Sequence, residues 1–79
     1  MSPTIFRERG YRFYFFSREE ARRHVHVFCT EVEAKYWLQP RIERAKSYGL
    51  SSQQLRRIEE MIREHEDELN RAWRRHFGN

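Results

Sequence analysis

The chain has 79 residues, enough for one domain, and its hydrophobic fraction of 38% lies above the range of disordered proteins. Its single cysteine, Cys29, excludes an internal disulfide and therefore the disulfide-stapled class of secreted domains. The 16 basic and 12 acidic residues give a net charge of +4, which suits a nucleic-acid or acidic protein partner but is equally compatible with a mixed solvated surface.

The aromatic content is the main source of a hydrophobic core. Six Phe, four Tyr and two Trp are available, and a chain this short buries only roughly 60% of its unfolded surface, so its core must be dense. No segment has the apolar length of a signal peptide or a membrane span. We therefore expect a cytoplasmic protein without a membrane partner.

The first two predicted strands form a hairpin. Thr4–Arg7 and Tyr11–Phe16 are rich in β-branched and aromatic residues and flank a turn at Gly10. Alternation along the second strand divides its side chains between two faces: Tyr11, Phe13 and Phe15 on one, and Arg12, Tyr14 and Phe16 on the other. Because both faces carry aromatic residues, we predict that this strand is covered on both sides.

A polar segment separates this hairpin from the next. Ser17–Glu20 has the pattern of a capping box, but residues 21–23 are too few for more than one helical turn, so we predict a loop. Two further strands follow, at His24–Cys29 and Val32–Leu38. A two-residue loop between them would pair three sets of residues across the strands: His26 with Lys35, Phe28 with Glu33, and His24 with Trp37.

The last third of the chain is predicted to be helical. Pro40 ends the preceding strand, Arg41–Tyr48 is predicted to be an extended edge segment, and Gly49 permits a bend. Ser51 and Gln54 form a capping box, and apolar residues then recur at three- and four-residue intervals with one phase. The sequence thus predicts an α+β fold, in which a small antiparallel β-sheet of four to five strands (residues 1–50) packs against one long C-terminal helix (residues 51–77).

The pattern His24-Val25-His26 is the strongest chemical signal. Two imidazoles at i and i+2 on a strand project from one face, which suits a general acid and base on one phosphate or a pair of metal ligands. A metal would need a third ligand, such as Glu31 or Glu33. Glu33 and Lys35 form a second pair on one strand face, as in the E-x-K half of many metal-dependent nucleases. The alternative is that one histidine packs in the core and the other lies on the surface.

Without a metal, His24, His26, Lys35 and Glu33 are the candidate catalytic residues of a ribonuclease-like phosphodiesterase. No Gly-rich phosphate loop or paired-cysteine motif is present, and we expect no cofactor. A basic, aromatic surface for single-stranded RNA is also predicted, unless the arginines serve only solubility. Its candidate residues are Arg7, Arg9, Arg12, Arg22, Arg23 and Tyr14.

A family resemblance rests on an ordered set of short motifs that spans nearly the whole chain. These motifs are Pro3-Thr4-Ile5-Phe6-Arg7, Gly10-Tyr11-Arg12-Phe13-Tyr14-Phe15, His24-Val25-His26-Val27, Glu33-Ala34-Lys35-Tyr36-Trp37-Leu38, Gly49-Leu50-Ser51 and the terminal Leu69…Trp73…Phe77. With them the sequence resembles the domain-of-unknown-function 4160 family. The resemblance implies a small stand-alone bacterial protein, one half of a two-gene module, with a toxin–antitoxin role and a cognate protein partner. The resemblance also strengthens the expectation that His24 and His26 are functional residues.

The sequence departs from the family pattern at two loops. Residues 20–23 replace a stretch that usually carries proline or glycine, and Cys29-Thr30-Glu31 replaces a loop that usually carries glycine. Three hypotheses follow, in order: a toxin acting on RNA through His24 and His26, a non-catalytic module that binds a protein or nucleic acid, and a metal-binding enzyme. An exposed edge strand and an apolar helix end would also allow a homodimer.

Overall fold

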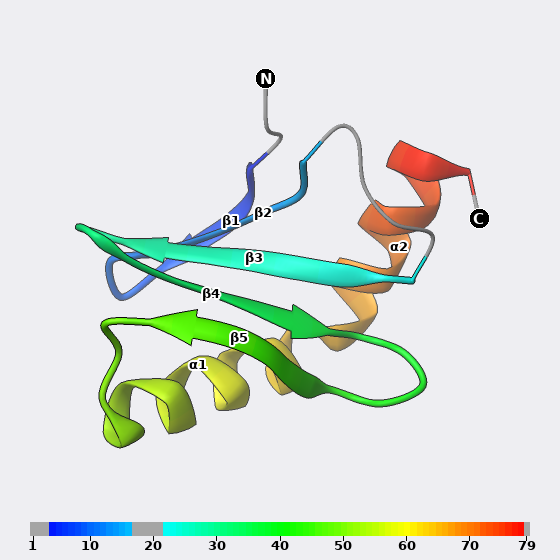
Figure 1. Ribbon diagram of the computed structural model, residues 1–79. Helices are drawn as coiled ribbons and strands as arrows, with labels where there is room; N and C mark the ends of the chain where they lie inside the picture. Colours follow the sequence, from blue (N-terminus) through cyan, green and yellow to red (C-terminus); the bar gives the residue numbers. More distant parts are fainter. Residues whose placement is uncertain (1–3, 17–21, 79) are drawn as a thin grey trace.

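The computed structural model describes residues 4–16 and 22–78, which form a five-stranded sheet and two helices (Figure 1). The elements in chain order are β1 (Thr4–Glu8), β2 (Tyr11–Tyr14), β3 (His24–Cys29), β4 (Val32–Trp37), β5 (Glu43–Tyr48), α1 (Ser52–Glu64) and α2 (Glu66–Phe77). The α+β class and the antiparallel sheet are therefore as predicted. The capping-box pattern at residues 17–20 lies outside the described residues.

The sheet is an antiparallel meander in which each strand pairs with its neighbours in the chain, in the order β1-β2-β3-β4-β5. The predicted register of β3 and β4 is confirmed, since His24 lies opposite Trp37, His26 opposite Lys35 and Phe28 opposite Glu33. The predicted edge segment is confirmed as β5, whose six residues are all exposed.

Two short turns set the registers of the hairpins. Arg9 and Gly10 both have positive φ, 53° and 84°, which is the requirement of a type I′ turn between β1 and β2. Thr30, the first residue of the β3–β4 turn, also has a positive φ of 54°. A β-branched residue is rare in that conformation, and it stands in the loop where the family pattern has glycine.

Both helices lie against one face of the sheet (Figure 1). The core between the two layers joins alternate residues of β2, β3 and β4 to the apolar stripe of the helices; its largest members are Phe13, Phe15, Tyr36, Ile58, Ile62, Leu69 and Trp73. Tyr36 ties the layers together, because its buried hydroxyl donates to Glu59 Oε2 on α1 over 3.1 Å. Burial raises the pKa of this hydroxyl.

The burial predicted for both faces of the second strand is present in its tyrosines and Phe13, because Tyr14 on one face and Tyr11 and Phe13 on the other are at most 7% exposed. Helices cover the face that carries Tyr11, Phe13 and Phe15, while the opposite face has no described layer above it. On that open face Phe16 and Phe28 are 42% and 40% exposed. Phe16 and Phe28 are therefore surface residues, whereas Tyr14 between them in the sheet is buried, and we refer to this side of the sheet as the open face.

The prediction of one long C-terminal helix is also wrong, because the helix is interrupted at His65. Its φ and ψ of −107° and 18° depart from helical values, and they separate α1 from α2. The first turn of α2 consists of Glu66, Asp67 and Glu68, and negative charge is favourable at a helix N-terminus but unfavourable along a continuous helix. That acidic run is the signal for the interruption.

The two ends of the helical segment are as predicted. Ser51 and Gln54 form a reciprocal capping box at the start of α1, and Gly78 ends α2 in the left-handed conformation. Neither helix of the described chain is long and apolar enough to cross a membrane.

Candidate nucleic-acid interface

The centre of the open face is a row of four residues that crosses four strands. Tyr14 of β2 lies opposite His26 of β3, His26 opposite Lys35 of β4, and Lys35 opposite Lys46 of β5. Residues directly opposite one another in an antiparallel sheet share a face and lie within contact of each other. The row therefore joins an aromatic ring, an imidazole and two ammonium groups.

A second row runs parallel to the first, two residues along each strand. Arg12 lies opposite Phe28, Phe28 opposite Glu33, and Glu33 opposite Tyr48. Tyr48 is 71% exposed, which is unusual for a ring of this size. This row alternates charged and aromatic side chains, with the carboxylate of Glu33 beside the exposed ring.

A bulge in β5 places Lys46 and Tyr48 on the open face. Glu43 lies opposite Trp37 and Arg44 opposite Tyr36, but Lys35 lies opposite Lys46, so Ala45 is the additional residue. Strict alternation from Glu43 would have placed Lys46 on the helix side with Arg44. Neither Lys46 nor Tyr48 was predicted as a site residue, because their orientation depends on this bulge.

The first row, together with Glu33 and Tyr48 of the second, lines a hollow of about 340 Å³ on the open face, which we call the sheet hollow. Its lining includes the only two lysines of the sequence, Lys35 and Lys46, which face each other across the strands. Among the described residues its lining is Tyr14, Phe16, His26, Glu33, Ala34, Lys35, Lys46, Ser47 and Tyr48. The hollow thus brings together three of the four predicted catalytic residues.

His24, the fourth, lies beneath this surface. Its side chain is completely buried, with its ring centroid 5.3 Å from that of Trp73 on α2 and 5.6 Å from that of Trp37. Nδ1 donates to the carbonyl oxygen of Arg22 over 2.7 Å. His24 and His26 have ring centroids 5.2 Å apart, but only His26 reaches the hollow. In this arrangement a substrate in the sheet hollow contacts one imidazole, not two.

Four of the six predicted nucleic-acid-binding residues lie on the open face. Arg12 is held over the Tyr14 ring at 4.5 Å and lies opposite Arg7 of β1. Arg22 lies 4.1 Å above the Trp37 ring and forms an ion pair of 3.6 Å with Glu43. These arginines add positive charge to the open face, although none of them is among the described residues that line the hollow.

The other two predicted arginines point elsewhere. Arg23 donates to Asn70 Oδ1 of α2 over 2.9 Å, so it connects the sheet to a helix. Arg9 lies in the β1–β2 turn, 3.9 Å from Glu8, and faces α1.

Comparison with known protein families shows the family to which the chain belongs. The profile described as a domain of unknown function (DUF4160) matches residues 10–74, more than four fifths of the sequence. The chain belongs to the DUF4160 family. Neither the curated proteins nor the solved structures contain a significant match. The region matched by the DUF4160 profile includes all the lining residues of the sheet hollow that the structure describes, whereas Arg7 and Arg9 lie outside it.

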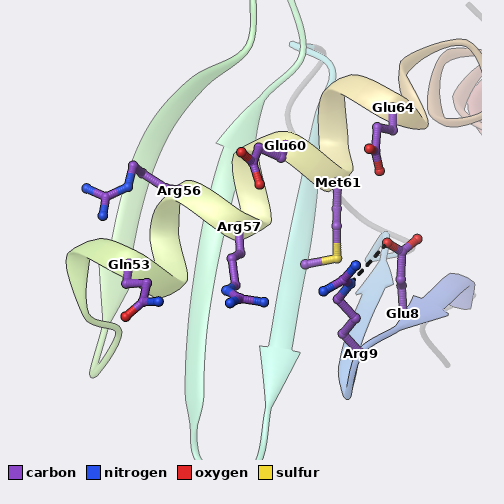
Figure 2. A pocket seen from close by; sticks show the side chains of 8 residues that line it. All are labelled: Glu8, Arg9, Gln53, Arg56, Arg57, Glu60, Met61 and Glu64. Carbon is purple, nitrogen blue, oxygen red and sulfur yellow. Dashed lines mark ion pairs between the residues drawn. The ribbon is translucent and has the colours of Figure 1, made fainter.

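This DUF4160 protein has a second hollow, of about 380 Å³, between the β1–β2 turn and α1 (Figure 2). Figure 2 shows Met61 extending from α1 toward Arg9 of the hairpin, which also contributes Glu8, with Arg57 on the same side of the helix. The remaining lining residues are Gln53, Arg56, Glu60 and Glu64. Three arginines are balanced by three glutamates and no aromatic ring is present, so this hollow lacks the features that favour a nucleic acid.

The metal hypothesis finds no support in the described side chains. Within residues 4–16 and 22–78, no group of three or more His, Cys, Asp and Glu side chains is placed to hold a metal ion. His24 is turned toward the tryptophans and the Arg22 carbonyl, so it does not join His26 and Glu33 around a common point. Cys29 is half-buried at the end of β3.

Proposed function

We propose that this DUF4160 protein is a binding module for single-stranded nucleic acid, with RNA as the expected ligand and the sheet hollow as its centre. The observation that carries the proposal is the direct opposition of Lys35 and Lys46 beside exposed aromatic rings. Single-stranded nucleic acids are bound by surfaces that combine cations for the phosphates with aromatic rings for the bases.

Lys35 Nζ lies 4.6 Å from the centroid of the Trp37 ring, and the residue directly opposite Lys35 is a second lysine, Lys46. Like charges directly opposite on neighbouring strands destabilise a sheet, and here the two lysines of the chain occupy such positions. A phosphate between Lys35 and Lys46 would remove this repulsion. The pair thus presents two cationic groups on one face of the sheet, where an anionic ligand could contact both.

The exposed rings supply the second requirement. Phe16, Phe28 and Tyr48 are 42%, 40% and 71% exposed and lie on the same face as the lysines. Each base stacked on an aromatic side chain contributes roughly 1–3 kcal/mol, and the contribution tolerates any base. The arginines above Tyr14 and Trp37 add cationic surface at the rims.

A second function, RNA cleavage, is favoured by one observation. His26, Glu33 and Lys35 line the same hollow, so a bound phosphate would lie near an imidazole, a carboxylate and an ammonium group. These groups can move a proton and stabilise phosphate charge. In that case the protein would be the toxin of a two-gene module, and a small cognate partner would cover the open face.

The binding proposal is tested with a fluorescent RNA of mixed sequence, about ten nucleotides long, within the range of known single-stranded binding sites. The wild type is compared with Lys46→Glu and with Arg56→Glu, which makes the same change in net charge at the second hollow. We expect Lys46→Glu to weaken binding at least tenfold and Arg56→Glu to have little effect. The slope of log affinity against log salt should fall by about 0.7 for each phosphate that the variant no longer neutralises.

Equal effects of the two variants would show that binding depends on net charge alone and would contradict the sheet hollow as the site. A DNA strand of the same sequence shows whether the ribose contributes. Gel analysis of the RNA after incubation tests the second function: cleavage by the wild type that His26→Gln abolishes would support it, and intact RNA would count against it.

A further inference from the structure

Building on the proposed function, we infer that the sheet hollow selects guanine among the bases of a single-stranded ligand. The features that carry this inference are the carboxylate of Glu33 and the ring of Tyr48, which lie directly opposite each other on β4 and β5. Both side chains are exposed and both line the hollow.

The Glu33 carboxylate is available to a ligand. Across the described part of the chain, it forms no hydrogen bond and no ion pair with another residue. Likewise, no other described ring stacks on Tyr48, which is 71% exposed. A hydrogen-bond acceptor and a stacking surface are therefore presented together, one on each of two paired strands.

The edges of the four bases differ in what they offer a carboxylate. An ionised carboxylate only accepts hydrogen bonds, and its two oxygens suit two parallel N–H donors. Guanine presents adjacent N1–H and N2–H groups on its Watson–Crick edge. Adenine and cytosine present an amino group beside an acceptor nitrogen, and uracil presents an N–H between two carbonyl oxygens. A base stacked on Tyr48 can therefore pair both its donors with Glu33 only when it is guanine.

The positions of the lysines fit the rest of the nucleotide. Lys35 and Lys46 lie two residues from Glu33 and Tyr48 along their strands, which is about 7 Å at the rise of a β-strand. The lysine row can hold a phosphate while the row of Glu33 and Tyr48 holds the base attached to it. A nucleotide would then lie along the strand direction, with its base toward the β3–β4 turn.

A carboxylate at the edge of a phosphate site also reduces non-specific affinity. Glu33 repels any phosphate that approaches the hollow from this end. Removing water from its carboxylate costs free energy, and only a base with two donors replaces both of the lost hydrogen bonds. The residue therefore lowers affinity for wrong ligands as well as raising it for the right one. This explains an acidic residue at the edge of a hollow lined by two lysines and aromatic rings.

The test uses oligouridine strands about ten nucleotides long, each with one central guanine, adenine or cytosine, and oligouridine itself as the reference. We expect the guanine strand to bind the wild type about tenfold more tightly than the others, the lower part of the range for a bidentate base contact. Glu33→Gln should abolish this preference, because an amide offers one acceptor and places a donor against a donor. Glu31→Gln, the same change in the exposed β3–β4 turn, should retain it.

Failure of the inference can be told from failure of the proposed function. If all four strands bind the wild type equally, or if Glu33→Gln keeps the guanine preference, the inference is overturned while binding to single strands stands. If no strand binds, both are overturned. Comparing the affinities of the wild type for the four RNA strands tests guanine selection even if the Glu33→Gln variant does not fold.

Discussion

His65, at the interruption between α1 and α2, is hydrogen-bonded to Glu8 of β1 over 2.9 Å between Nε2 and Oε1. On its other side Nδ1 lies 2.8 Å from Oε1 of Glu68. The ring also stacks on Phe6, with centroids 3.9 Å apart. His65 is half-buried at the rim of the core, where it joins the helix interruption to the edge strand.

The first prediction concerns pH. Only a protonated imidazole donates from both nitrogens, so the two carboxylates favour His65 in its charged form. The hydrogen bond with Glu68, followed by that with Glu8, raises the pKa of His65 above its ordinary value of 6.5. A raised folded-state pKa stabilises the protein fully below 6.5, and this stabilisation is lost as pH rises through the folded-state pKa.

Thermal unfolding of the wild type and His65→Gln across pH 5.5 to 8.5 measures this contribution, at roughly the scale of exposed ion pairs, 0.2–1 kcal/mol. We expect the wild type to lose its advantage over the variant as pH rises above about 6.5. A difference that is constant with pH would mean that His65 stabilises the fold by packing on Phe6 alone.

The second prediction separates the two histidines of β3. Replacing the buried His24 by Ala leaves a cavity beside Trp37 and Trp73, and such losses of large core side chains cost about 2–5 kcal/mol. His26→Ala, at the half-buried lining of the hollow, should cost about 1 kcal/mol or less. Urea unfolding of the two single variants checks this, and similar costs would contradict the different burial of the two side chains.

This difference bears on any functional test of the histidine pair. A variant that changes both histidines would lose activity through unfolding whether or not either one contacts a ligand. Substitution of His26 alone, by Gln, removes the imidazole from the sheet hollow and leaves the core intact. A loss of RNA affinity in His26→Gln with unchanged stability would place His26 in the interface.

The hairpins could be predicted from the sequence because their signals are local. Gly10 and the two-residue spacing at Thr30-Glu31 define turns, and alternation then sets the registers of β2, β3 and β4. The capping box at Ser51 and the periodic stripe likewise located the helical segment. Even the departure at Thr30 from the family pattern left the turn in place, although with a positive φ.

The candidate site could be predicted only in part because its remaining features are not local. Lys46 and Tyr48 reach the open face through a bulge at Ala45, and nothing in the sequence of β5 marks one. His24 has the correct strand parity for the open face, yet Trp73 from α2, far along the chain, packs against it. The interruption at His65 was signalled by the acids that follow it, but the apolar stripe continues through it in one phase.

The third prediction concerns two glycines with similar backbone conformations. Gly10 and Gly49 have φ of 84° and 77°, so a side chain at either position is strained by roughly 1–2 kcal/mol. At Gly49 a Cβ would also lie 2.6 Å from Cγ1 of Val32, whereas at Gly10 it meets no atom within 4 Å. We therefore expect Gly49→Ala to cost about 2–4 kcal/mol and Gly10→Ala about half as much or less.

Chemical unfolding of both variants measures these costs. The cost of Gly49→Ala is then measured again in a protein that also carries Val32→Ala. If the contact with Val32 causes the excess loss, Gly49→Ala should cost clearly less in the Val32→Ala protein than in the wild type. An equal cost in both backgrounds would attribute the loss to the backbone alone.

The fourth prediction is that the sheet hollow favours binding at the expense of stability. In Lys46→Glu an opposite charge faces Lys35, and a favourable cross-strand pair replaces a repulsive one. Cross-strand charge pairs contribute roughly 0.2–1 kcal/mol, so the variant should be more stable than the wild type by an amount of this size. The same substitution should weaken RNA binding. Residues maintained for packing show the opposite behaviour, because their loss reduces stability and function together.

Urea unfolding at low and high salt distinguishes this explanation from a change in β-propensity. Salt screens the repulsion between Lys35 and Lys46, because both side chains contact solvent. The stability advantage of Lys46→Glu over the wild type should therefore shrink as ionic strength rises. Lys46→Gln, which removes the repulsion without adding an attraction, should have intermediate stability. If Lys46→Glu is instead less stable than the wild type at every salt concentration, the lysine pair is part of the structural framework, and its opposition no longer argues for an anionic ligand.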